Sequence, residues 1–165
     1  MATSLSVERL VFSFPRGWLA SKYDDWSFYR NQFSSQGGGI KAIDLLALSP
    51  NGDAYLIEVK DYRHPDAVRP SELPQAIADK VLMTLAALLP AKLRASDAGE
   101  RESADKILQC KKLRVIAHVE QPRAHRPLVD PADLRMKLRQ LLRAVDPHVK
   151  VVSTSHMSSL GWTVN

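Results

Sequence analysis

The sequence has a single cysteine, Cys110, among its 165 residues, so no disulfide bond can form within the chain. Such sparing use of cysteine is typical of proteins in a reducing compartment. No apolar run approaches the roughly 20 residues that a membrane-spanning helix needs. The first residues, MATSLSVERL, also lack the basic start and apolar core of a secretory signal. These absences exclude a scaffold of internal disulfides and predict a cytoplasmic protein.

Several familiar site patterns are also missing. We find no zinc-binding spacing of cysteine and histidine, no phosphate-binding glycine loop and no indication of a Ser-His-Asp triad. The three glycines at 37–39 lack the helix-opening context that a phosphate loop requires. The functional residues therefore have to be sought among the acidic and basic side chains.

The composition is that of one globular domain, residues 1–165, with 45% hydrophobic and 25% charged residues. The net charge is +5 and the isoelectric point is about 9.5. A basic excess of this size favours a polyanionic partner such as nucleic acid, although it is also common on solvated surfaces.

Strands and helices alternate along the predicted chain, which indicates an α/β or mixed α+β fold with a central mixed sheet flanked by helices. Periodicity and turn signals predict strands over 10–14, 43–49, 53–63, 113–120 and 149–155, and helices over 21–33, 74–96 and 131–145. Pro90 is expected to kink or end the second helix. Asp130 is expected to cap the third, and 161–165 to add an edge strand.

The turn at 49–52, SPNG, decides which residues of the hairpin face each other. A two-residue Asn-Gly turn would place Asp44 opposite Val59. Serine, proline and glycine at the first, second and fourth positions instead favour a type I turn followed by a left-handed glycine bulge. This three-residue hairpin places Asp44 directly opposite Glu58.

The hairpin therefore brings two carboxylates, Asp44 and Glu58, and the ammonium of Lys60 onto one face of an apolar sheet. Directly opposed like charges are destabilising, and a divalent cation between them would reverse that effect. Two carboxylates with water and a substrate phosphate form a typical Mg²⁺ site. The alternative is a buried Lys60 that bridges both carboxylates without any metal.

An Asp on one strand followed by Glu-x-Lys on the next resembles the signature of the PD-(D/E)xK nuclease superfamily. Here the matching residues are Asp44 and Glu58-Val59-Lys60. The resemblance implies a restriction-endonuclease-like core and metal-dependent hydrolysis of DNA phosphodiester bonds. It also implies that Asp44, Glu58 and the carbonyl of Val59 bind Mg²⁺ or Mn²⁺, while Lys60 assists the water or the transition state.

Many members of that superfamily add an acidic residue from the first helix and some add a glutamine from the helix after the motif. Asp24 and Asp25 are the candidates for the acid, and we prefer Asp25. The alternative is an aspartate that only favours the helix dipole. Gln75 fits the glutamine position, with Lys80 as a weaker addition, and either could be an ordinary polar helix residue.

The chain also departs from the superfamily pattern. Only two strands are expected between the first and second helices, so the strand at 10–14 is expected to supply the third. Ile43 replaces the usual proline before the motif aspartate.

Tyr62 and Arg63 follow the motif lysine and are expected to contact DNA at the end of the strand, with Lys22 lining the same groove. The alternative for Arg63 is a snorkelling side chain that caps the strand. The expected partner is DNA, branched or structured forms included, and the chain is expected to act as a homodimer or beside another protein. The alternative to a nuclease is an inactive scaffold or nucleic-acid-binding subunit.

Overall fold

The computed structural model describes residues 1–124 and 126–165, and their strands form two β-sheets. The larger sheet has the order β3-β4-β5-β6-β7 and the smaller one the order β1-β2-β8. The strands are β1 (Thr3–Val7), β2 (Leu10–Phe14), β3 (Leu19–Lys22), β4 (Leu45–Leu48), β5 (Asp53–Asp61), β6 (Lys112–Glu120), β7 (Lys150–Val152) and β8 (Thr163–Val164). The helices are α1 (Leu73–Arg94), α2 (Ala98–Leu108) and α3 (Pro131–Leu141).

The larger sheet combines an antiparallel meander with a parallel half. β3, β4 and β5 pair antiparallel, whereas β5, β6 and β7 pair parallel. The chain passes through α1 and α2 between β5 and β6, and through α3 between β6 and β7. The carboxyl ends of the three parallel strands therefore meet at one edge of the sheet. The mixed α/β class expected from the sequence is confirmed at this level.

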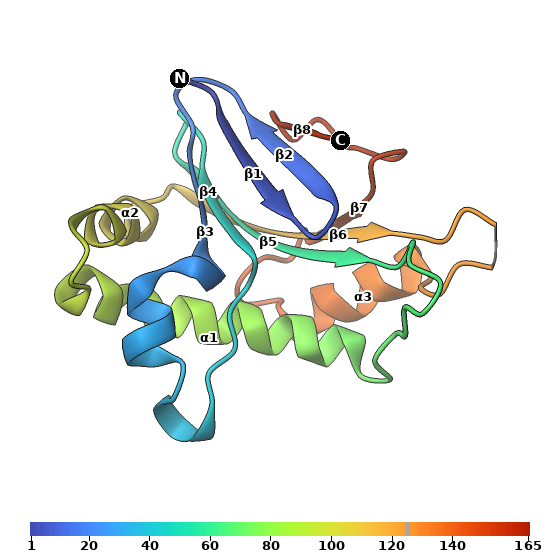
Figure 1. Ribbon diagram of the computed structural model, residues 1–165, viewed down its shortest axis with the longest axis horizontal. Coiled ribbons are helices and arrows are strands. Elements are labelled where there is room, and N and C mark those ends of the chain that lie inside the picture. The colour runs from blue at the N-terminus through green and yellow to red at the C-terminus, as the bar shows by residue number, and fades with distance from the viewer. Residues whose placement is uncertain (125) are drawn as a thin grey trace.

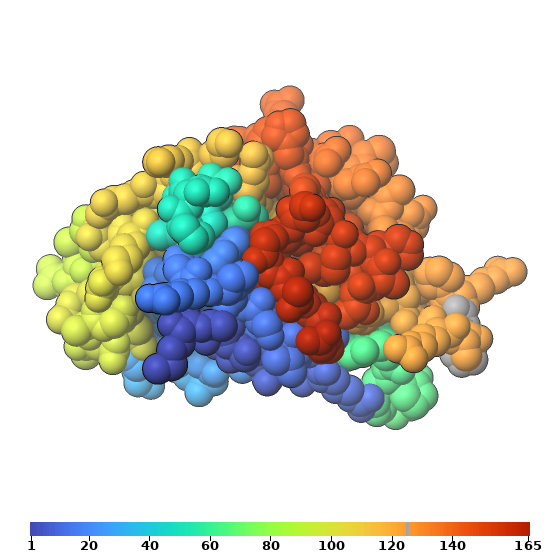
Figure 2. All heavy atoms as spheres, turned by 90° about the horizontal axis from the view of Figure 1, so that it is seen from above, coloured from blue at the N-terminus to red at the C-terminus, as the bar shows by residue number. Residues whose placement is uncertain are grey.

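The two faces of the larger sheet are covered differently, with helices on one face and the smaller sheet on the other (Figure 1). Leu56 belongs to the apolar cluster with α1 and α3, while its neighbours Ile57 and Val59 pack with Phe12 and Phe14 of β2. Alternation along β5 explains this division. Figure 2 shows the amino-terminal hairpin beside the carboxyl-terminal segment, which agrees with the pairing of β2 and β8.

The turn between β4 and β5 has the predicted three-residue form. The amide of Ser49 donates to the carbonyl of Asp53 at 2.9 Å, and Gly52 has a left-handed φ of 87°. Leu45 then pairs with Ile57, so Asp44 lies opposite Glu58. The predicted register is confirmed.

The expected helix over 21–33 is wrong for its first half, and only 27–33 is helical. Its first residues belong to β3, which pairs with β4 from Leu19 to Lys22, and a short 3₁₀ turn (Tyr23–Asp25) and one π turn (Tyr29–Phe33) follow. Tyr23 is wholly buried and its amide donates to the carbonyl of Asp44 at 3.0 Å. Burial of the Tyr23 ring in the core decides the backbone conformation here, against the near-helical spacing of the aromatic residues in this segment.

The strand at 10–14 is also not the third strand of the larger sheet. It is β2 of the smaller sheet, and β3 completes the meander instead. The start of the third helix is confirmed, because the side chain of Asp130 accepts hydrogen bonds from the amides of Ala132 and Asp133, but the helix ends at Leu141 and not at 145. α1 runs on through Pro90 to Arg94, so of the two expectations for Pro90, a kink or an end, the end is wrong.

Candidate active site

Asp44 and Glu58 lie side by side on the face of the sheet that α1 covers. Asp44 immediately precedes β4, and its Oδ2 accepts a 2.7 Å hydrogen bond from the amide of Val59. Glu58 lies in the middle of β5 and its side chain is 0% exposed. The register of the hairpin thus holds one half-buried and one fully buried carboxylate together.

Two lysines converge on the same oxygen of Glu58. The Nζ atoms of Lys60 and Lys80 lie 2.8 Å and 2.6 Å from its Oε1. The other oxygen, Oε2, is buried and has no hydrogen-bond partner among the described residues. A buried carboxylate oxygen without a partner is costly, so this atom is the natural place for a ligand that the protein binds.

The electrostatics of the cluster follow from burial and like charge. Burial first, and then the charge of Glu58, raise the pKa of Asp44 to about 7, against the opposing effects of the Val59 amide and the two lysines. For Lys60, burial alone would lower the pKa, but the charge and hydrogen bond of Glu58 outweigh it and raise the pKa. Lys60 is therefore charged at neutral pH and suited to stabilise an anion rather than accept a proton.

Asp24 and Asp25, the two candidates for the additional acid, have different surroundings. Asp25 pairs with Lys22 at 3.2 Å and with Arg30 on the surface. Asp24 instead has a buried Oδ1 without a hydrogen-bond partner among the described residues. Burial is the main cause that raises the pKa of Asp24, and the charges of Lys22, Arg30 and, least of all, Lys80 oppose it. Asp24 therefore lies within electrostatic reach of the cluster.

Gln75 does not reach the carboxylates. Its side chain is exposed and donates a 2.7 Å hydrogen bond to Asp79 within α1. Lys80, five residues later, projects to Glu58 instead. The sequence contained a signal for this role, because Lys80 stands beside the buried positions Ile77 and Val81 of an apolar helix face.

The three residues that were expected to contact nucleic acid, Tyr62, Arg63 and Lys22, form contacts within the protein. Tyr62 is 5% exposed and its amide donates to the carbonyl of Glu120, so its ring cannot stack on a base without rearrangement. Arg63 donates two hydrogen bonds to Asp61, at 2.8 Å and 2.7 Å, at the end of β5. Lys22 is held by Asp25 and remains only 30% exposed.

Asp44 and Glu58 fit a divalent cation that takes only a few of its ligands from the protein. Within residues 1–124 and 126–165, no group of three or more acidic, histidine or cysteine side chains converges. Mg²⁺ is commonly held by one or two carboxylates, with water and substrate phosphate completing its coordination. The orphaned Oε2 of Glu58 and the half-buried carboxylate of Asp44 match that donor set. The ammonium groups already on Oε1 leave Oε2 free.

Comparison with known proteins yields one partial match. No family model matches the chain, and neither does any solved structure. A cysteine–tRNA ligase of Neisseria meningitidis serogroup A / serotype 4A is 29% identical over an alignment 150 positions long, and the match covers 73% of this chain. The match covers 21% of the ligase, so the chain spans about a fifth of that protein. In the described part of the chain, no helix has the length and apolarity needed to cross a membrane.

Proposed function

We propose that this chain is a metal-dependent nuclease that hydrolyses DNA phosphodiester bonds. The observation that carries the proposal is the buried carboxylate of Glu58, which lies opposite Asp44 and keeps one oxygen without a partner. A wholly buried carboxylate costs several kcal/mol unless it is compensated. An apolar side chain at this position would serve a purely structural role without that cost in free energy.

The roles follow from the geometry and from the PD-(D/E)xK resemblance. Asp44, Glu58 and the carbonyl of Val59 would hold Mg²⁺ or Mn²⁺, which supplies an activated water and neutralises phosphate charge. The charged Lys60 would stabilise the negative charge that develops at phosphorus. The meander β3-β4-β5 followed by α1 and β6 is consistent with a restriction-endonuclease-like core and supports this reading.

A second candidate is an inactive nucleic-acid-binding unit. Lys80 favours it, because an ammonium group 2.6 Å from Glu58 partly replaces a metal. The partial match to a cysteine–tRNA ligase, an enzyme that acts on tRNA, also favours it. This candidate predicts binding without cleavage.

The test is cleavage of supercoiled plasmid and of branched DNA with Mg²⁺ or Mn²⁺. Wild type is compared with Lys60→Ala and with Lys137→Ala, which alters an exposed lysine of α3. Cleavage by wild type and Lys137→Ala that is lost in Lys60→Ala supports the nuclease. Cleavage that persists in Lys60→Ala, or is absent in wild type, contradicts it.

A further inference from the structure

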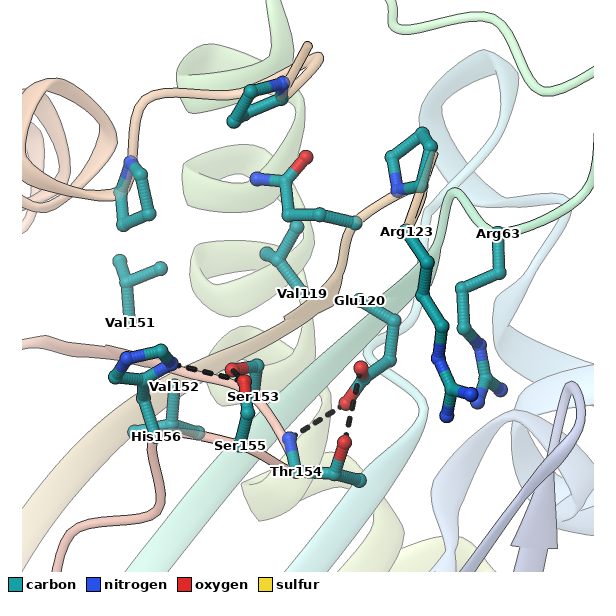
Figure 3. A pocket seen from close by; sticks show the side chains of 14 residues that line it. Arg63, Val119, Glu120, Arg123, Val151, Val152, Ser153, Thr154, Ser155 and His156 are labelled. Carbon is teal, nitrogen blue, oxygen red and sulfur yellow. Dashed lines mark hydrogen bonds between the residues drawn. The ribbon is translucent and has the colours of Figure 1, made fainter. Parts of the chain in front are cut away.

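A cavity of about 580 Å³ opens at the carboxyl ends of β6 and β7, beside the end of β5 (Figure 3). Its floor is apolar and includes Val119 and Val151, while Thr154 and His156 contribute polar groups to its wall. Figure 3 shows the side chains of Arg63 and Arg123 lying next to each other at one side of it. Ligand cavities in proteins typically measure about 300–1,000 Å³, so the volume is sufficient for a small organic group.

A second hollow of about 630 Å³ adjoins the first and shares Arg63, Pro122 and Arg123 with it. It also contains Arg9 from the turn between β1 and β2, together with His64. Three arginines from segments far apart in the sequence thus line the second hollow, and two of them, Arg63 and Arg123, lie where the two hollows meet. We call this surface the arginine groove, defined by Arg9, Arg63 and Arg123.

Two acidic residues beside Arg63 and Thr154, Asp61 and Glu120, are already engaged. Asp61 is bound by Arg63. The Oε1 of Glu120 lies 2.8 Å from His118 and accepts from the amide of Thr154 at 2.7 Å. Arg123 forms no ion pair with any other residue that the structure describes. Its charge is available to an external anion.

We propose that the arginine groove binds a single strand of DNA. A phosphate would bind Arg123, next to Arg63, whose Nε and Nη2 already donate to Asp61. The bases on either side of this phosphate would enter the two hollows. Arginine binds phosphate through several donors at once. Recesses lined by valine and proline can accept an unpaired base, whereas the bases of a duplex are stacked inside it and cannot enter.

The inference deepens the proposed function and rests on it for the identity of the ligand. Val119, on the cavity floor, is the register partner of Lys60 in the parallel pairing of β5 and β6. Adjacent strands lie about 4.8 Å apart. The cavity floor and the Asp44–Glu58–Lys60 cluster therefore lie on neighbouring strands of the same sheet.

The test measures binding of a fluorescent oligothymidine of about ten nucleotides by anisotropy, in EDTA so that no cleavage occurs. Wild type is compared with Arg123→Gln and with Arg94→Gln, a control at the exposed end of α1. We expect Arg123→Gln to weaken binding about ten-fold and to reduce the salt dependence by about one phosphate contact. Arg94→Gln is expected to bind as wild type does, and a duplex of equal length to bind less tightly than the single strand.

Equal affinity of Arg123→Gln and Arg94→Gln, or tighter binding of the duplex, would overturn the inference. Unchanged thermal unfolding of Arg123→Gln establishes that a loss of binding is not a loss of fold. The proposed function fails separately, in the Lys60→Ala cleavage assay. Lys60→Ala is expected to retain binding of the oligothymidine, because Lys60 is not among the groove residues.

Discussion

Lys80 of α1 meets Glu58 of β5 through a 2.6 Å contact between its Nζ and the Oε1 of a wholly buried carboxylate. The contact joins the longest helix to the strand that carries the motif. It also holds one oxygen of Glu58, while the other oxygen has no protein partner among the described residues. The helix thereby orients the carboxylate that the proposed metal site depends on.

We expect Lys80→Met to lower the free energy of unfolding by about 1–3 kcal/mol, because it removes a charged partner from a buried ion. Lys92→Met, which breaks the exposed pair with Asp105, is the matched control and should cost about 0–1 kcal/mol. Urea unfolding measures both. Equal losses of unfolding free energy in the two variants would show that the contact with Glu58 stabilises the protein no more than an exposed ion pair does.

The raised pKa of Asp44 makes stability depend on pH. Its folded-state pKa is about 7 against 3.8 in the unfolded chain. Between these values the folded protein holds a proton that the unfolded chain has released. Stability therefore falls as pH rises through this range, and the deficit is complete above about pH 7. Asp44→Asn should stabilise the metal-free protein at about pH 8 by about 1–3 kcal/mol after allowance for partial exposure, and by less at about pH 5.

Thermal unfolding in EDTA at the two pH values tests this expectation. The asparagine keeps an oxygen that can accept the hydrogen bond from the amide of Val59. Destabilisation at the higher pH would mean that the charge of Asp44 anchors the hairpin instead of opposing it.

Mg²⁺ or Mn²⁺ should raise the melting temperature of wild type but not of Asp44→Asn. A ligand at about 100 times its dissociation constant stabilises the folded state by about 2.7 kcal/mol. The gain should increase as pH rises past about 7, because the carboxylate of Asp44 must lose its proton before it can bind a cation. Asp133→Asn, on the exposed side of α3, is the control. An equal gain in Asp44→Asn would place the cation elsewhere.

Asp24 and Asp25 form a matched pair of neighbours with different surroundings. If the buried oxygen of Asp24 supports the site, Asp24→Asn should reduce DNA cleavage about ten-fold or more, in keeping with loss of an outer partner of a metal site. Asp25→Asn should leave cleavage within about two-fold, because it breaks only exposed pairs with Lys22 and Arg30. A larger loss of cleavage in Asp25→Asn than in Asp24→Asn would instead support Asp25 as the additional acid, as the sequence suggested.

Features that depend on neighbouring residues could be predicted from the sequence. The turn at 49–52 has a proline and a glycine whose backbone preferences select one hairpin register, and that register alone places Asp44 opposite Glu58. The cap of α3 is equally local, since Asp130 bonds to amides two and three residues ahead. In both cases the chemistry of a few adjacent residues limits the backbone to one conformation.

Features that depend on distant segments could not be predicted in this way. The aromatic residues after Lys22 have near-helical spacing, yet pairing of β3 with β4 and burial of Tyr23 decide their conformation. Lys80 approaches Glu58 only because α1 crosses the sheet at that point. The local sequence therefore determined the pairing of the two carboxylates, whereas tertiary packing decided which charges surround them, because side chains from separate elements meet only when those elements pack together.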